Sequence, residues 1–212
     1  IYLAWTGVIA WLAPDEADST PESRVLTPHP LGEVLSKVVF GELLMWDIPT
    51  GLLVQSLREP LMLTHHVAML MLAFTGLLGF WSYYAIFFFG VIEVSGVFLT
   101  FVDVFHPKHK PWCAYLKTAP RLNAFNNAMR AAFFVTYMFV RAILFPFVIF
   151  AYVLPDAYAV STLDGVVLGG YSMFFVSFVP VLGVLFTILQ LFWAQLLIRQ
   201  VLKLFCGGIK DE

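Results

Sequence analysis

The chain alternates long apolar runs with short polar segments, and this pattern predicts six membrane-crossing helices. One crossing requires about 20 apolar residues at a rise of about 1.5 Å per residue. The sequence begins without Met inside an apolar run, so we expect the first helix to be incomplete. The predicted helices are Ile1–Ala13, Gly32–Ser56, Pro60–Gly79, Trp81–Val104, Ala128–Leu154 and Tyr171–Leu202. The longest polar segments, where we expect loops, are Asp15–Pro30, His106–Asn127 and Asp156–Gly170.

Prolines are expected to shape two of these helices. Pro155 should end the helix Ala128–Leu154, because proline has no amide donor and clashes with the preceding turn. The stretch Tyr171–Leu202 would be about 48 Å long as one helix, more than a bilayer core requires. Pro180 is therefore expected to kink or split it. Residues 1–212 are predicted to form a single all-α transmembrane domain, a polytopic bundle.

The composition supports a membrane location. The chain is 60% hydrophobic and 12% charged, whereas soluble domains are about 45–50% apolar and about 25% charged. Lipid must therefore be the solvent for much of the surface. A formal net charge of −2 does not indicate a nucleic-acid partner. Cys113 and Cys206 have no CxxC neighbours, so two free thiols are expected.

The basic residues predict the orientation in the membrane. Nine lie on one predicted face and two on the other, a positive-inside bias that directs the first face to the cytosol, stroma or matrix. We expect a multi-pass protein of an endomembrane or organelle membrane. The nine are Arg58, Lys108, Lys110, Lys117, Arg121, Arg130, Arg199, Lys203 and Lys210, and the two are Arg24 and Lys37. An aromatic belt is expected on the opposite face, formed by Trp81, Tyr83, Tyr84, Tyr152 and Tyr158.

Ionisable residues lie inside the predicted spans, where they are costly and mark function by default. Counted at 1.5 Å per residue, Asp47, His66, Glu93 and Arg141 lie about 11 to 19 Å from the Arg58 face. They come from four helices and share one layer, which predicts a common polar cavity. Further candidates are Glu42, His65, Asp103 and Gln190.

The helix Trp81–Val104 carries one polar or small stripe. Glu93, Gly96, Thr100 and Asp103 follow helical spacing and share a face. The stripe predicts either a cavity wall or a close helix contact. A lone guanidinium is too costly in lipid, so Arg141 should contact Glu93, Asp47 or a lipid phosphate. A purely structural Glu93–Arg141 ion pair is the alternative to a functional site.

The histidines do not predict a metal site. His65 and His66 point about 100° apart on a helix, whereas a chelating helical pair stands at i and i+4. His106 and His109 stand three residues apart in a predicted loop, and this pair alone does not predict a metal ion. Phosphate-binding glycine loops and a GxSxG motif are absent from the sequence. No metal and no bound cofactor are therefore expected.

Several short motifs together resemble one membrane-protein family. They are Gly-Glu-Leu-Leu-Met-Trp-Asp at 41–47, Arg-Glu-Pro-Leu-Met-Leu-Thr-His-His at 58–66, Glu-Val-Ser at 93–95, Phe-Val-Arg at 139–141 and Gln-Leu-Phe-Trp at 190–193. Their order and helix placement are similar to the TLC domain, found in ceramide synthases, translocon-associated membrane proteins and smaller TLC-domain proteins. The resemblance implies six or more helices around a long apolar cavity that holds lipid or an acyl chain.

The chain departs from the family's patterns in the fourth helix. Ceramide synthases carry a His-Asp pair followed by a further Asp, and residues 92–96 have no such pair. The smaller TLC proteins continue Glu-x-Ser with Thr, Pro and later Asn, where this chain has Gly96, Val97 and Thr100. The resemblance is therefore nearer to the smaller branch.

Three functions remain open. The first is a lipid-binding or lipid-regulating protein, whose binding residues would be His66, Glu93, Ser95, Thr100, Arg141 and Gln190. The second is an acyltransferase using acyl-CoA, in which His65 or His66 is the base or acyl acceptor and Asp47 or Glu93 orients it. The basic segment Lys108–Arg121 would then attract CoA phosphates. The third is a non-catalytic subunit of a larger membrane complex. In a lipid-binding protein and in an acyltransferase alike, at least one imidazole of His65 and His66 should hydrogen-bond Asp47 or Glu93, directly or through water.

Overall fold

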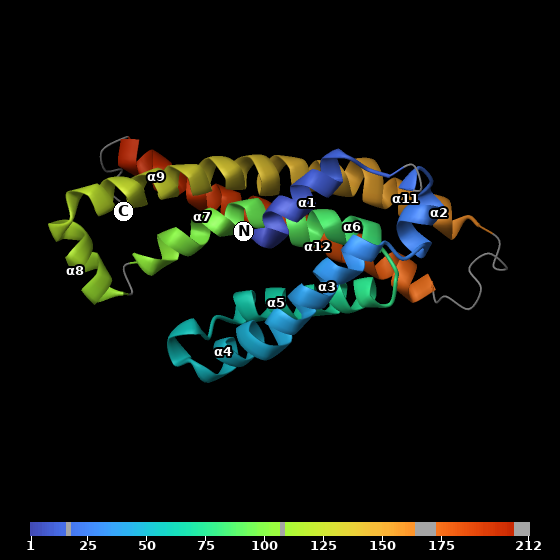
Figure 1. The fold of residues 1–212 in the computed structure, drawn as a ribbon, viewed down its shortest axis with the longest axis horizontal. Helices are drawn as coiled ribbons and strands as arrows, with labels where there is room; N and C mark the ends of the chain where they lie inside the picture. Colours follow the sequence, from blue (N-terminus) through green and yellow to red (C-terminus); the bar gives the residue numbers. More distant parts are fainter. Residues whose placement is uncertain (16–17, 107–108, 164–172, 206–212) are drawn as a thin grey trace, which may run out of the picture.

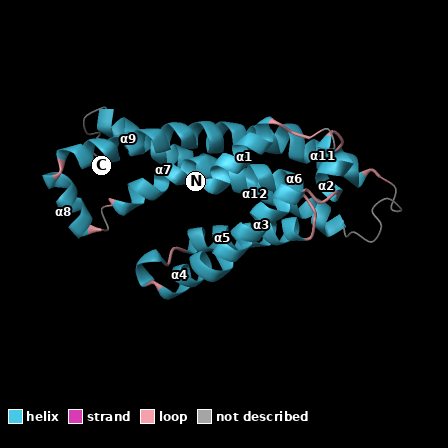
Figure 2. Cartoon of the chain, viewed as in Figure 1, coloured by secondary structure: helices cyan, strands magenta, loops and turns pink. Residues whose placement is uncertain are grey.

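The computed structural model is an elongated bundle of helices (Figure 1) and describes residues 1–15, 18–106, 109–163 and 173–205. Within these ranges short loops join the helices, and no strand occurs (Figure 2). The α-helices are α1 (Tyr2–Leu12), α2 (Pro21–Leu26), α3 (Pro30–Glu42), α4 (Ile48–Leu53), α5 (Pro60–Leu77), α6 (Ser82–Ile86), α7 (Glu93–Val104), α8 (Lys110–Thr118), α9 (Pro120–Tyr137), α10 (Phe145–Val148), α11 (Leu154–Ser161) and α12 (Met173–Phe205). The 3₁₀ turn is η3 (Gln55–Leu57), and the π-helical segments are η2 (Leu43–Asp47), η4 (Phe87–Val91), η5 (Met138–Leu144) and η6 (Ile149–Val153).

Four stretches of the described chain are long and apolar enough to cross a membrane. They are Pro60–Leu77, Ser82–Val104, Pro120–Ser161 and Met173–Lys203. The first predicted helix is the shorter apolar α1, and the second, α3 to α4, is interrupted by the π turn that contains Asp47. The predicted all-helical transmembrane bundle is confirmed.

The loops group at two ends of the bundle. Helices α2 and α11 lie together at one end, and α8 lies at the other end with the last described turns of α12 (Figure 1). This is the grouping expected from the Lys and Arg distribution. The compartment that each end faces stays a prediction. Predicted features at Lys108, residues 164–170, Cys206 and Lys210 lie outside the described residues.

The predicted loop His106–Asn127 is wrong for most of its length. Lys110–Thr118 forms α8, and α9 begins at Pro120. Pro111 and Pro120 lie in the first turns of these helices, where a missing amide donor leaves no hydrogen bond unmade. Prolines that suggested a loop therefore mark two helix starts.

The predicted helix end at Pro155 is also wrong, because the helical stretch continues to Ser161. Pro49, Pro146 and Pro155 each lie in the first turn of an α segment that follows a π turn. A π turn interrupts the regular ladder of hydrogen bonds from residue i to residue i−4. Proline, which has no amide N–H to donate, is therefore tolerated just after it. Pro180 lies inside the continuous helix α12, so the predicted split does not occur.

Two residues of the predicted aromatic belt face inward. Tyr84 is fully buried, and its hydroxyl donates a hydrogen bond to Asp156. Trp81 is also buried, and its indole N–H donates to the carbonyl of Phe175 at 3.2 Å. Tyr152 and Tyr158 are exposed, as a belt requires. Polarity at this end therefore serves to fasten helices as well as to meet the membrane surface.

Asp156 joins α2 to the end of the long helical stretch Pro120–Ser161. Arg24 donates to both of its carboxylate oxygens, at 2.6 and 2.7 Å. These hydrogen bonds raise the pKa of the Arg24 guanidinium further above its usual value, so it stays charged. The core beside this end is centred on α6 and η4, where Phe87 and Ile86 are almost fully buried. This end is the closed end of the bundle.

Helix α1 reaches the core by a close backbone contact. A Cβ placed on Gly90 of η4 would lie 2.6 Å from the Cα of Gly7. Only glycine at both positions allows this approach. The contact positions η4, and through it the start of α7, where the candidate site begins.

Candidate functional site

A cavity of about 1490 Å³ lies between the α3–α5 arm and helices α7, α9 and α12. Pockets for small ligands usually occupy about 300–1,000 Å³, so this cavity is large. Its lining includes the apolar side chains of Val39, Met69, Phe89 and Leu196. Apolar walls of this extent suit a hydrocarbon ligand.

The four residues predicted to share one depth all line this cavity. Asp47 comes from η2, His66 from α5, Glu93 from α7 and Arg141 from η5. The predicted stripe on α7 also faces it, since Gly96, Thr100 and Asp103 line the same space. The stripe was predicted to be either a cavity wall or a close helix contact, and in the structure it is a cavity wall.

Three of these residues lie at or beside π-helical segments. Asp47 is the last residue of η2, Arg141 lies within η5, and Glu93 follows η4 by two residues. A π turn adds a residue to one helical turn and so rotates the side chains that follow it. Such turns occur frequently at functional sites. A uniform helical repeat therefore does not give the angle of these side chains about the helix axis.

Arg141 binds Ser95 more closely than it binds Glu93. Its Nε donates to the Ser95 hydroxyl at 2.7 Å, and Nη2 lies 3.9 Å from the Glu93 carboxylate. Ser95 is fully buried and in turn donates to the carbonyl of Ile92 at 3.1 Å. The expected Arg141–Glu93 contact exists, but it is long. The Glu93 side chain remains 40% exposed and so presents a carboxylate to the cavity.

Tyr137 is part of this network, although the sequence reasoning did not identify it. Its hydroxyl donates to the side-chain oxygen of Gln190 at 2.7 Å, and the Arg141 guanidinium lies 5.9 Å from its ring centroid. The available signal was its position one turn before Arg141 on the same helix face. Gln190 is buried by this contact and does not line the cavity. The pair fastens α9 to α12.

The two histidines occupy different surroundings, although both line the cavity. His65 meets the rings of Phe186 and Trp193 edge-on, with centroids 5.2 and 5.4 Å away. Its Nδ1 is buried and has no hydrogen-bond partner. Within the described residues, no direct hydrogen bond joins His65 or His66 to a carboxylate. The carboxylate-oriented imidazole expected for an acyltransferase is therefore not formed directly.

The cavity lining is acidic. Five carboxylates and two guanidinium groups contribute, a net charge of −3 with neutral histidines. The carboxylates are Glu42, Asp47, Glu59, Glu93 and Asp103, and the guanidinium groups are Arg58 and Arg141. This field disfavours phosphate groups inside the cavity and favours polar groups that donate hydrogen bonds. In the described part of the chain, no three His, Cys, Asp or Glu side chains are placed to hold a metal ion.

The comparison with known families agrees with the motifs. The TLC domain family model matches residues 5–199, most of the chain. The chain has no match among the curated proteins or among the solved structures. The family match and the four apolar helices together establish an integral membrane protein. With its motif residues on four helices around one cavity, this chain belongs to the TLC-domain family.

Proposed function

We propose that the protein binds a membrane lipid in this cavity. The acyl chain would lie along the apolar walls, and the polar end would meet the layer of Glu93, Ser95 and Arg141. The observation that carries the proposal is the cavity itself: a space of about 1490 Å³ with apolar side chains and with ionisable residues from four helical segments in its walls. Ionisable groups are costly in lipid unless they serve a ligand or one another.

The geometry of Arg141 supports a ligand for Glu93. Arg141 directs its closest hydrogen bond to Ser95, so the Glu93 carboxylate at 3.9 Å is only weakly paired. A hydroxyl or amide of a lipid could donate a hydrogen bond to it. A purely structural ion pair would place both groups in direct contact.

An acyltransferase is the second candidate, because His65 and His66 line the cavity. Two observations favour the acyltransferase less than the lipid-binding protein. In the described part of the chain neither imidazole donates a direct hydrogen bond to a carboxylate, and the acidic lining disfavours the phosphates of acyl-CoA. His66→Ala separates the two candidates: it abolishes acyl transfer from labelled acyl-CoA in an enzyme, whereas a binding protein has no turnover to lose.

A non-catalytic subunit of a membrane complex is the third candidate. The broad exposed apolar faces of the helices can contact lipid or partner helices equally well. No specific contact in the described residues favours this candidate over lipid binding.

Lipid content of cavity-filling variants tests the proposal. Thr100→Trp on α7 and Met62→Trp on α5 place an indole in the cavity from opposite walls. Val135→Trp is the matched control, because Val135 is 63% exposed on the outside of α9. The purified proteins are compared by mass spectrometry of extracted lipids, after size exclusion has established that each is folded.

We expect acyl lipid to copurify with the unmodified protein and with Val135→Trp. Both cavity variants should lose most of it, a decrease of several-fold. Unchanged lipid in two folded cavity variants would rule out the cavity as the binding site.

A further inference from the structure

Helix α8 has the composition of a helix that lies on a membrane surface. Lys110 and Lys117 stand seven residues apart and therefore share one face. Trp112 and Tyr115 lie away from that face and are 55% and 57% exposed. Aromatic side chains of this kind prefer the boundary between hydrocarbon and water, and lysine stems extend toward that boundary.

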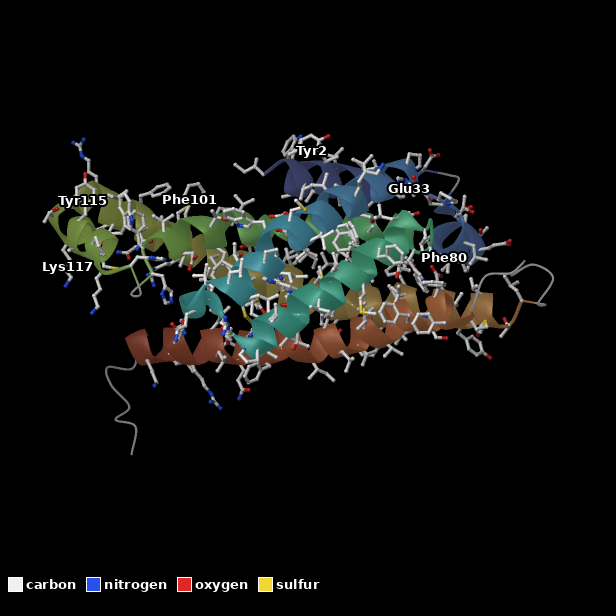
Figure 3. All side chains as sticks on the ribbon, turned by 90° about the horizontal axis from the view of Figure 1, so that it is seen from below. Tyr2, Glu33, Phe80, Phe101, Tyr115 and Lys117 are labelled. Carbon is white, nitrogen blue, oxygen red and sulfur yellow. The ribbon has the colours of Figure 1, made fainter. Side chains whose placement is uncertain are left out.

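The position of α8 agrees with its composition. It crosses the end of the bundle instead of continuing along it, at the end opposite α2 and α11 (Figure 1). The side-chain view shows Tyr115 and Lys117 at this end, far from Phe80 and Glu33 (Figure 3). The Cys113 thiol, a single weak donor, lies 3.4 and 3.3 Å from the carbonyl oxygens of Phe105 and His106.

The cations of α8 and of the first turn of α9 form no ion pairs that would neutralise them within the described residues. Lys110, Lys117 and Arg121 are exposed, and none of them forms an ion pair within the described residues. They also lie outside the acidic cavity lining, although Trp112 and His109 form part of it. Positive charge therefore stands just outside a cavity whose own walls are negative.

We propose that α8 lies in the headgroup layer and that Lys110 and Lys117, together with Arg121 in the first turn of α9, bind anionic phospholipid headgroups beside the cavity. A basic helix with exposed aromatic residues binds such a surface by apolar burial and electrostatic attraction together. The site is separate from the proposed lipid cavity, because the acidic lining disfavours the same phosphates that α8 attracts. Anionic lipid would thus bind beside the cavity and not inside it.

The test compares two lipids with identical acyl chains. The full chain in non-ionic detergent is titrated with phosphatidylglycerol or phosphatidylcholine, and the first binding constant for each is measured by native mass spectrometry. Identical chains make the acyl-chain contribution cancel in the ratio of the two affinities, and Thr100→Trp, which fills the cavity, reports any contribution of the headgroup there. The variant is Lys110→Gln/Lys117→Gln/Arg121→Gln, and Lys37→Gln on α3 is the control because Lys37 is also an exposed cation.

We expect the unmodified protein to prefer phosphatidylglycerol, with each neutralised cation lowering the affinity ratio by up to about fivefold. The triple variant should have a ratio near one, and Lys37→Gln should keep the original ratio. Added salt should lower the ratio, because the attraction is between exposed charges.

Three results would overturn the proposal: no preference in the unmodified protein, a preference retained in the triple variant, or an equal loss in Lys37→Gln. Absence of lipid preference together with binding of poly-glutamate would assign the surface to an acidic protein partner instead. Thr100→Trp should leave the ratio unchanged, so failure of the cavity proposal and failure of this one are distinguishable.

Discussion

Removal of the Arg141 guanidinium tests whether Ser95 or Glu93 is its main partner. In Arg141→Met, the hydrogen bond from Nε to the Ser95 hydroxyl at 2.7 Å is lost. Hydrogen bonds to charged groups contribute about 1.5–3 kcal/mol, and those between membrane helices contribute about 0.6–1.7 kcal/mol. The Glu93 carboxylate is 40% exposed and 3.9 Å away, so its share is below about 1 kcal/mol. We expect Arg141→Met to lower the free energy of unfolding by about 2 kcal/mol.

Double-mutant cycles separate the two partners. Ser95 keeps its own hydrogen bond to the Ile92 carbonyl when Arg141 is removed, so no buried hydroxyl is left without a partner. The coupling energy between Arg141→Met and Ser95→Ala should be about 1–2 kcal/mol. The coupling between Arg141→Met and Glu93→Gln should be below about 0.5 kcal/mol.

Reversible unfolding in mixed micelles, followed by circular dichroism, measures these energies. Arg130→Met on α9 is the control, because Arg130 is exposed and forms no ion pair in the described residues. It should leave the free energy of unfolding almost unchanged. A larger coupling to Glu93 than to Ser95 would refute the ranking of partners and restore the structural ion pair as the better explanation.

Two further predictions use the same assay. Gly90→Ala should lower the free energy of unfolding by about 2–3 kcal/mol, because its Cβ would lie 2.6 Å from Gly7, whereas Gly41→Ala meets open space and should not destabilise. Equal effects at the two glycines would contradict the close contact between α1 and η4. Tyr84→Phe should cost about 1–2 kcal/mol, because it removes the hydrogen bond to Asp156. No loss of stability in Tyr84→Phe would mean that this hydrogen bond does not hold the closed end together.

The sequence alone predicted that the site residues share one layer. A helix rises by a constant amount per residue, and the polar turns mark where each helix meets the membrane surface. Asp47, His66, Glu93 and Arg141 could therefore be placed in one layer without coordinates, and all four line one cavity. The motifs at the same positions identified the family.

The tertiary structure alone decided which direction each side chain faces. Three π turns change the rotation of the helices at the site, and their positions follow from no simple repeat in the sequence. Ser95, which lies off the polar stripe of α7, is the closest partner of Arg141. Gln190 has the right residue type for the site but turns away to bind Tyr137.

Position along a helix and rotation about its axis also differ in predictability at the ends of the bundle. Tyr84 and Tyr158 both lie near one membrane edge by sequence position, yet Tyr84 is fully buried and Tyr158 is 73% exposed. Distance along a helix axis is local and accumulates residue by residue. Rotation about that axis depends on which neighbouring helices the residue meets, and only the packed bundle determines those neighbours.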